Sequence, residues 1–149
     1  MKYFTVEELT ESSTAIKENI DNTPSKEITE HLIELIEELL DPIREKWAEY
    51  CNINKLGNPA ISVSSGYRCK ELNKAVNGSV TSAHMTGYAA DLQNVSGSRE
   101  EFYQFLLNFL KDRNFDECFS EYNKYTKWIH IALYNSKKLQ RKKVGKLYV

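Results

Sequence analysis

Two of the three histidines have surroundings that suit a metal site. His84 and His130 lie among polar or small residues, whereas His31 lies among charged residues and is expected at the surface. Asp91 follows His84 by seven positions, with Gly87 between them, so a loop can turn at the glycine into a strand that presents the carboxylate. Two histidines and one aspartate, with water in the fourth position, are a ligand set of catalytic zinc sites.

The spacing from His84 to Asp91 is a weak signal when it is taken alone. A chance pairing of one histidine and one aspartate beside a strand is then the more common explanation. Whether His84 and Asp91 form a metal site or a chance pairing therefore depends on the elements that position them and on the surrounding sequence.

Three segments have the pattern of helices. Apolar residues recur at helical spacing from Ser25 to Cys51, where Pro42 should kink or divide the helix. Thr5 begins a short helix with capping-box spacing to Glu8, and a third helix is expected from Ser98 to about Arg113.

Four segments have the pattern of strands, and they alternate with the helices too irregularly for a doubly wound sheet. We therefore predict an α+β domain in which a small, mostly antiparallel sheet is covered by helices on one side, leaving the other face for a site. The predicted strands are residues 60–64, 88–92, 117–122 and 127–133.

Length and composition favour one domain over residues 1–149. With 41% hydrophobic and 28% charged residues, the chain can bury a core, and no apolar run is long enough to insert into a membrane. Cys51, Cys69 and Cys118 lie far apart without C-x-x-C spacing, so we interpret them as buried thiols.

The formal net charge of −1 hides a basic C-terminal tail, residues 137–149. Six positive charges lie there, so residues 1–136 carry about −7. Such a tail could hold an anionic polymer such as teichoic acid or nucleic acid, although a solvated terminus is the more common case.

Three motifs resemble the signature of the zinc D-alanyl-D-alanine carboxypeptidase family, in its phage and bacterial subgroup. The family pattern contains S-G-Y-R, S-x-H-x-x-G-x-A-x-D and W-x-H. The chain matches it at Ser65-Gly66-Tyr67-Arg68, at Ser82-Ala83-His84-Met85-Thr86-Gly87-Tyr88-Ala89-Ala90-Asp91, and at Trp128-Ile129-His130.

The resemblance implies a Hedgehog/DD-peptidase-like fold, a zinc ion held by His84, Asp91 and His130, and hydrolysis of an amide bond in peptidoglycan peptides. The first residues lack the apolar core of a secretion signal. We therefore expect synthesis in the cytoplasm and action on the cell wall after release, for example as a phage endolysin.

Arg68 and Ser82 are the candidate substrate-binding residues. The guanidinium of Arg68 could hold a substrate carboxylate or stabilise the oxyanion formed during hydrolysis, and its alternative role is an ion pair with Glu71. Ser82 could orient the loop or donate to substrate, and a capping role is equally compatible with its position.

The resemblance implies the general base, and strand register supports it. The subgroup carries F-D-Q-x-x-x-E upstream of the final histidine, and residues 115–121 match it with Glu117 in place of Gln, so Glu121 is the leading candidate. Many relatives carry Glu or Asp three residues before the final histidine, where this chain has Lys127. If residues 123–126 form a hairpin loop, Glu121 faces Trp128 and shares a sheet face with His130, within reach of the attacking water. Glu117 has the same parity and is the second candidate, as base or as a partner of His130. A shift of the strand register by one residue would turn both carboxylates to the other face of the sheet.

Two other functions remain open at this level. A catalytically inactive, zinc-containing module that binds cell wall or protein is compatible with Lys127. Nucleic-acid binding has the least support, because the basic tail lacks an aromatic stacking pattern. The sequence does not define the scissile bond, carboxypeptidase or endopeptidase action, or the oligomeric state.

Overall fold

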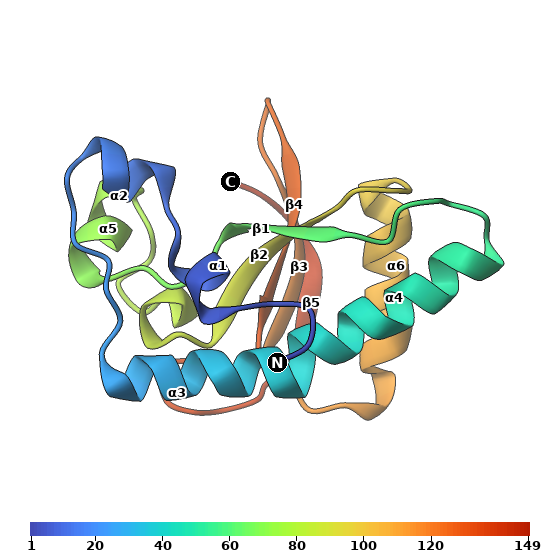
Figure 1. Ribbon diagram of the computed structural model, residues 1–149, viewed down its shortest axis with the longest axis horizontal. Coiled ribbons are helices and arrows are strands. Elements are labelled where there is room, and N and C mark those ends of the chain that lie inside the picture. Colours follow the sequence, from blue (N-terminus) through green and yellow to red (C-terminus); the bar gives the residue numbers. More distant parts are fainter.

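The computed structural model, which describes residues 1–149, is built around one five-stranded sheet (Figure 1). The strands lie in the order β1-β2-β4-β3-β5, and every neighbouring pair is antiparallel except β3 and β5. The prediction of an α+β fold with a mostly antiparallel sheet is therefore confirmed. The strands are β1 (Ile61–Ser65), β2 (Ala89–Asn94), β3 (Glu117–Tyr122), β4 (Lys127–Ala132) and β5 (Lys143–Tyr148).

Six α-helices and three π-helical or 3₁₀-helical turns accompany the sheet, and several α-helices begin with a side-chain cap. The Thr5 hydroxyl accepts from the Glu8 N–H at 3.1 Å, as predicted, and Ser98 accepts from the Glu101 N–H at 3.0 Å. The helices are α1 (Val6–Thr10), α2 (Ser13–Lys17), α3 (Lys26–Leu35), α4 (Asp41–Ile53), α5 (Lys70–Ala75) and α6 (Arg99–Phe109); the turns are η1 (Ile36–Leu40), η2 (Ala83–Thr86) and η3 (Leu110–Asp112).

Pro42 reshapes the predicted long helix without ending it. The turn before it, η1, is π-helical, and the Asp41 N–H donates to the Ile36 carbonyl. Proline has no N–H for the carbonyl four residues earlier, and its ring crowds that carbonyl, so a wider turn relieves the contact. Consequently α3, η1 and α4 follow one another as one continuous helical rod (Figure 1).

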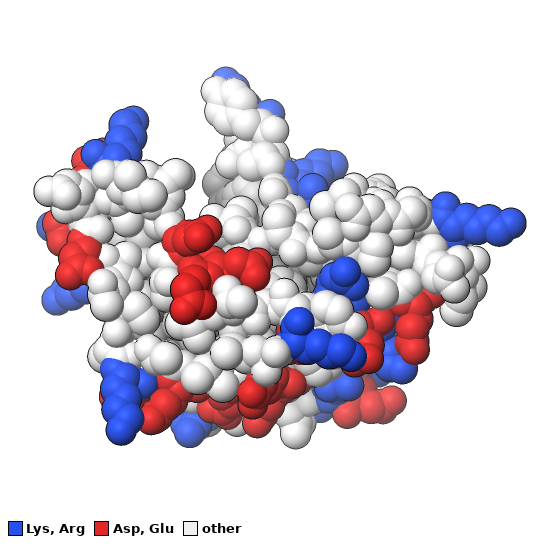
Figure 2. Space-filling view, viewed as in Figure 1, with Lys and Arg blue, Asp and Glu red and all other residues white.

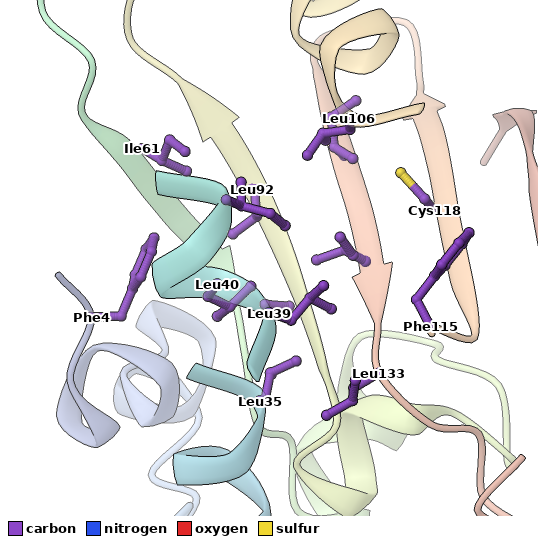
Figure 3. Packing of buried hydrophobic residues seen from close by; sticks show 14 of the residues in the cluster. Phe4, Leu35, Leu39, Leu40, Ile61, Leu92, Leu106, Phe115, Cys118 and Leu133 are labelled. Carbon is purple, nitrogen blue, oxygen red and sulfur yellow. The ribbon is translucent and has the colours of Figure 1, made fainter. Parts of the chain in front are cut away.

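The hydrophobic core lies between this rod, α6 and one face of the sheet. Leu39 and Leu40 of η1 lie over β2, on the side of the sheet that carries Leu92, and Leu106 of α6 lies over β4 (Figure 3). The main helices therefore cover one face, as predicted. None of the helices is both long and apolar enough to cross a bilayer.

The opposite face of the sheet carries polar groups because strand residues alternate between faces. In β4, Ile129 and Ile131 are fully buried in the core, which turns Trp128 and His130 to the other side. The hairpin has the predicted register, with Glu121 opposite Trp128 and Phe119 opposite His130.

The C-terminal tail contains a strand that the sequence analysis missed. β5 lies parallel to β3, with Gly145 opposite Phe119, although most of its side chains are exposed. Cys69 also differs from expectation: Cys51 and Cys118 are buried, but Cys69 is partly exposed because its Sγ caps α5, accepting from Leu72 N–H at 3.4 Å.

Candidate metal centre

Three separate elements bring His84, Asp91 and His130 together. His84 lies on η2, Asp91 on β2 and His130 on β4, where the antiparallel register sets it opposite Asp91. Both histidines are buried, Asp91 is partly buried, and one donor atom from each residue lies within 4.8 Å of the others. This cluster can hold a metal ion.

A backbone carbonyl fixes the ring of His84. Its Nδ1 lies 2.7 Å from the Gly66 carbonyl oxygen, which only accepts, so Nδ1 carries the proton and Nε2 keeps its lone pair. That Nε2 lies 3.3 Å from Asp91 Oδ1. Ser82 has the capping role, because its hydroxyl accepts from the His84 backbone N–H at 3.1 Å.

A carboxylate holds the ring of His130 in a similar way. Its Nε2 lies 3.2 Å from Glu117 Oε1, and its Nδ1 lies 3.1 Å from Asp91 Oδ1. Each histidine therefore turns one nitrogen toward the same aspartate oxygen and gives the other to an acceptor. Histidines that bind metals usually have this outer hydrogen bond.

The electrostatics of the cluster favour a cation. Burial lowers the pKa of His84, which is therefore neutral, as a ligand must be. Burial alone would lower the pKa of His130, but its hydrogen bonds to Asp91 and Glu117 outweigh this and raise it to about 10. Without a metal the His130 ring therefore carries a proton, which a bound ion would displace. Although burial acts to raise the pKa of Asp91, the two histidines lower it below its usual value. Two imidazoles and one ionised carboxylate suit zinc.

Glu121 is not one of the three grouped donors, and its hydrogen-bond partner differs from that of Glu117. Its Oε1 accepts from the Trp128 indole N–H at 2.9 Å. Burial raises its pKa, while the charge of His130 and the indole hydrogen bond act in the opposite direction. A carboxylate with a raised pKa beside a candidate metal centre suits proton transfer.

A cleft of about 710 Å³ contains these groups and Arg68. The Nε of Arg68 is buried without a hydrogen-bond partner, and Arg68 forms no ion pair with Glu71. Burial lowers its pKa, against the attraction of Asp91 and Glu121. An unpaired guanidinium donor in a cleft is suited to an anionic group of a ligand.

The walls of the cleft come from the middle and the C-terminal part of the chain. One wall is the loop after α5, residues 76–82, and the other is formed by β3, β4 and the end of β5. In Figure 2, a notch separates the lobe that contains α2 and α5 from the projecting hairpin of β3 and β4.

Two partners of the site were not identified from sequence. His31 is not a simple surface residue, because its Nδ1 lies 2.8 Å from the Thr86 carbonyl oxygen and its ring stacks on Tyr88 at 4.3 Å. It thus ties η2, which carries His84, to α3. Trp128 holds Glu121, and the predicted register, which paired these two residues, was the available signal.

The family model for Peptidase M15 matches residues 2–132. No curated protein matches the chain. Peptidases of this family depend on zinc, and the donor set of His84, Asp91 and His130 has the composition that zinc requires. The match includes all three donors and most of the sheet, so the chain belongs to the peptidase M15 family of zinc metallopeptidases.

Proposed function

We propose that this metallopeptidase hydrolyses an amide bond in peptidoglycan peptides, in lysis of the cell wall as by a phage endolysin or in its remodelling. The observation that carries the proposal is one cleft that contains the His84–Asp91–His130 donor set, the buried carboxylate of Glu121 and the unpaired guanidinium of Arg68. Amide hydrolysis needs a Lewis acid, a base and a cation. The donor set would hold the Lewis acid, Glu121 is the proposed base, and Arg68 is the cation.

The three donors His84, Asp91 and His130 would hold the zinc ion, which would acidify a water molecule and polarise the scissile carbonyl group. Glu121 accepts a proton from the attacking water, whose oxygen forms a bond to the scissile carbonyl carbon. The same carboxyl group returns the proton to the amide nitrogen as the C–N bond breaks. The products are one free carboxyl group and one free amine.

Arg68 supplies positive charge on the substrate side of the cleft. Its buried Nε has no partner within the protein, so a substrate carboxylate or the developing oxyanion can complete its hydrogen bonding. Peptidoglycan stem peptides carry free carboxylates, which supports them as substrates. The motif that contains Arg68 also resembles that of the D-Ala-D-Ala carboxypeptidases.

The assignment of the base is tested by a matched pair of variants. Glu121→Gln keeps an oxygen for Trp128 but cannot take a proton, so we expect turnover to fall about 10²-fold to 10⁴-fold while one zinc ion stays bound. Glu117→Gln removes the other carboxylate and should retain much more activity. Full activity in Glu121→Gln and its loss in Glu117→Gln would reverse the assignment.

The substrate is tested with purified cell walls. The wild type should release new amines, and mass spectrometry of the muropeptides should identify one cleaved bond. If zinc binds in full but walls and muropeptides stay intact, the protein is a binding module, and the proposed function is wrong.

A further inference from the structure

Glu117, which accepts from the outer nitrogen of His130, is held by a residue of the C-terminal segment. Arg141 Nη2 lies 3.2 Å from Glu117 Oε2, while Glu117 Oε1 lies 3.2 Å from His130 Nε2. One carboxylate therefore connects a guanidinium to a ring of the candidate metal centre.

Asp116 fixes the position of that guanidinium. The side chain of Asp116 is fully buried and accepts from Arg141 Nε at 2.7 Å and from Nη2 at 2.8 Å. Its Oδ1 also accepts from the Arg141 backbone N–H at 3.1 Å. Two parallel bonds fix the plane of a guanidinium, so the orientation of Nη2 toward Glu117 is set from the buried side.

We propose that Arg141 is a positioning residue of the metal centre, which holds the Glu117 carboxylate and, through it, the ring of His130. The inference rests on the proposed function in one respect, that His130 binds zinc. Glu117 needs such a partner because it is partly buried and lies near another carboxylate, that of Glu121. Without the guanidinium, it would be free to turn toward solvent.

The segment that supplies Arg141 lies beyond the part of the chain that the family model matches, which ends at residue 132. Backbone hydrogen bonds attach it to the two residues just before β3, from Lys142 N–H to the Phe115 carbonyl at 3.1 Å and from Lys143 N–H to the Asp116 carbonyl at 2.8 Å. Leu147 of the same segment lines the cleft. Residues outside the matched region therefore complete the site.

The test is zinc affinity, measured by competition with a chromophoric chelator. Arg141→Ala should bind zinc about tenfold more weakly, as is typical when a partner of a metal ligand is lost, and Arg141→Lys should fall between this variant and the wild type. Lys137→Ala removes one exposed charge without an ion-pair partner and should bind as the wild type does. The visible spectrum of the Co²⁺ form should change only in the Arg141 variants.

A double variant separates positioning from general stability. If Arg141 acts through Glu117, Glu117→Ala/Arg141→Ala should bind zinc no more weakly than Glu117→Ala alone. Additive losses would overturn the proposal, as would wild-type affinity in folded Arg141→Ala.

Arg141→Ala leaves the buried Asp116 carboxylate unpaired and can therefore fail to fold. In that case Asp116→Asn/Arg141→Gln removes both charges of the pair and should still show the tenfold loss; unchanged affinity would refute the role. A wild type that binds no zinc would refute the proposed function itself, whereas zinc binding equal in wild type and variants would refute only the role of Arg141.

Discussion

Glu117 and Glu121 lie on the same face of β3, but their contacts give them different roles. Glu117 is bound between Arg141 and His130, so its oxygens already have partners on both sides. Glu121 has one oxygen bound to the Trp128 indole and no ion-pair partner. These contacts support our proposal that Glu121 is the carboxylate that exchanges a proton with water.

Trp128→Phe should move the acid side of the pH–activity profile toward higher pH. The indole N–H stabilises the charged form of Glu121 and lowers its pKa, so its removal raises the pKa. The base is active when deprotonated, and activity at the acid end would be lost at a higher pH than in the wild type. The measurement is kcat/KM against pH, with zinc content as the control.

An unchanged acid side in zinc-loaded Trp128→Phe would contradict the role of Glu121 as base. Phe keeps most of the packing of the ring, so a loss of activity at every pH, without a shift of the profile, would instead indicate damage to the hairpin.

Side-chain chemistry at this scale was partly predictable from sequence. The resemblance implied His84, Asp91 and His130 as ligands, and strand parity placed Glu121 on the face of His130. Arg141 could not be found in this way, because its pairing with Asp116 depends on a chain segment returning across 25 positions. Local patterns do not encode such a return.

At the scale of elements, the glycine of the S-G-Y-R motif explains how a strand end is joined to the metal loop. A Cβ on Gly66 would lie 2.2 Å from the Leu9 carbonyl oxygen, so only glycine fits between α1 and β1. This close approach also places the Gly66 carbonyl against His84 Nδ1. Packing of the first helix and orientation of a candidate zinc ligand thus depend on one position.

Gly66→Ala should lower the free energy of unfolding by about 2 kcal/mol, because backbone atoms must move apart to admit the methyl group. Zinc affinity should fall as well, since the carbonyl that holds His84 moves. Urea denaturation of the zinc-free protein measures the first effect, and chelator competition measures the second.

Gly145→Ala is the matched control for this substitution. A Cβ there would meet only the Phe119 side chain, at 3.6 Å, which is an ordinary contact. Its stability should stay within about 1 kcal/mol of the wild type. If Gly66→Ala and Gly145→Ala change the free energy of unfolding by similar amounts, the close approach at Gly66 does not contribute to stability.

Elements with regular patterns were predicted well, and those defined by distant partners were not. The β3–β4 register followed from the length of the hairpin loop, and the cap of α1 followed from the spacing of Thr5 and Glu8. β5 was missed because its pattern is basic and mostly exposed, and because its backbone partner, β3, lies much earlier in the chain. The π-helical turn depends on how the helix accommodates Pro42, which a periodic pattern does not reveal.

For the whole molecule, the basic C-terminal segment is joined to the acidic remainder by specific pairs. Arg141 binds Asp116 and Glu117, and Lys146 lies 2.9 Å from Glu100. Acidic side chains also gather over α1, at the centre of the face in Figure 2. Some basic residues of the C-terminal segment therefore form ion pairs within the protein. The remaining exposed lysines could still attract an anionic polymer.

Deleting residues 141–149 should destabilise the protein and weaken zinc binding together. Asp116, which is fully buried, loses its cation, and β3 loses a neighbouring strand. Loss of one partner from a fully buried pair costs about 3 to 5 kcal/mol, and because the Arg141 side chain is 38% exposed we expect the lower end of that range. For a chain of this length, that corresponds to a fall in Tm of roughly 10 °C. Thermal unfolding of the zinc-free protein and chelator competition provide the two measurements.

The control changes charge but keeps the strand. Lys142→Gln/Lys143→Gln/Lys146→Gln removes exposed positive charges and one surface ion pair, which contributes little to stability. This variant should unfold and bind zinc nearly as the wild type does, because Arg141 and the backbone pairing of β5 are intact. If instead this variant loses as much stability and zinc affinity as the deletion does, the segment acts through its charge alone. Its position beside β3 would then not support the metal centre.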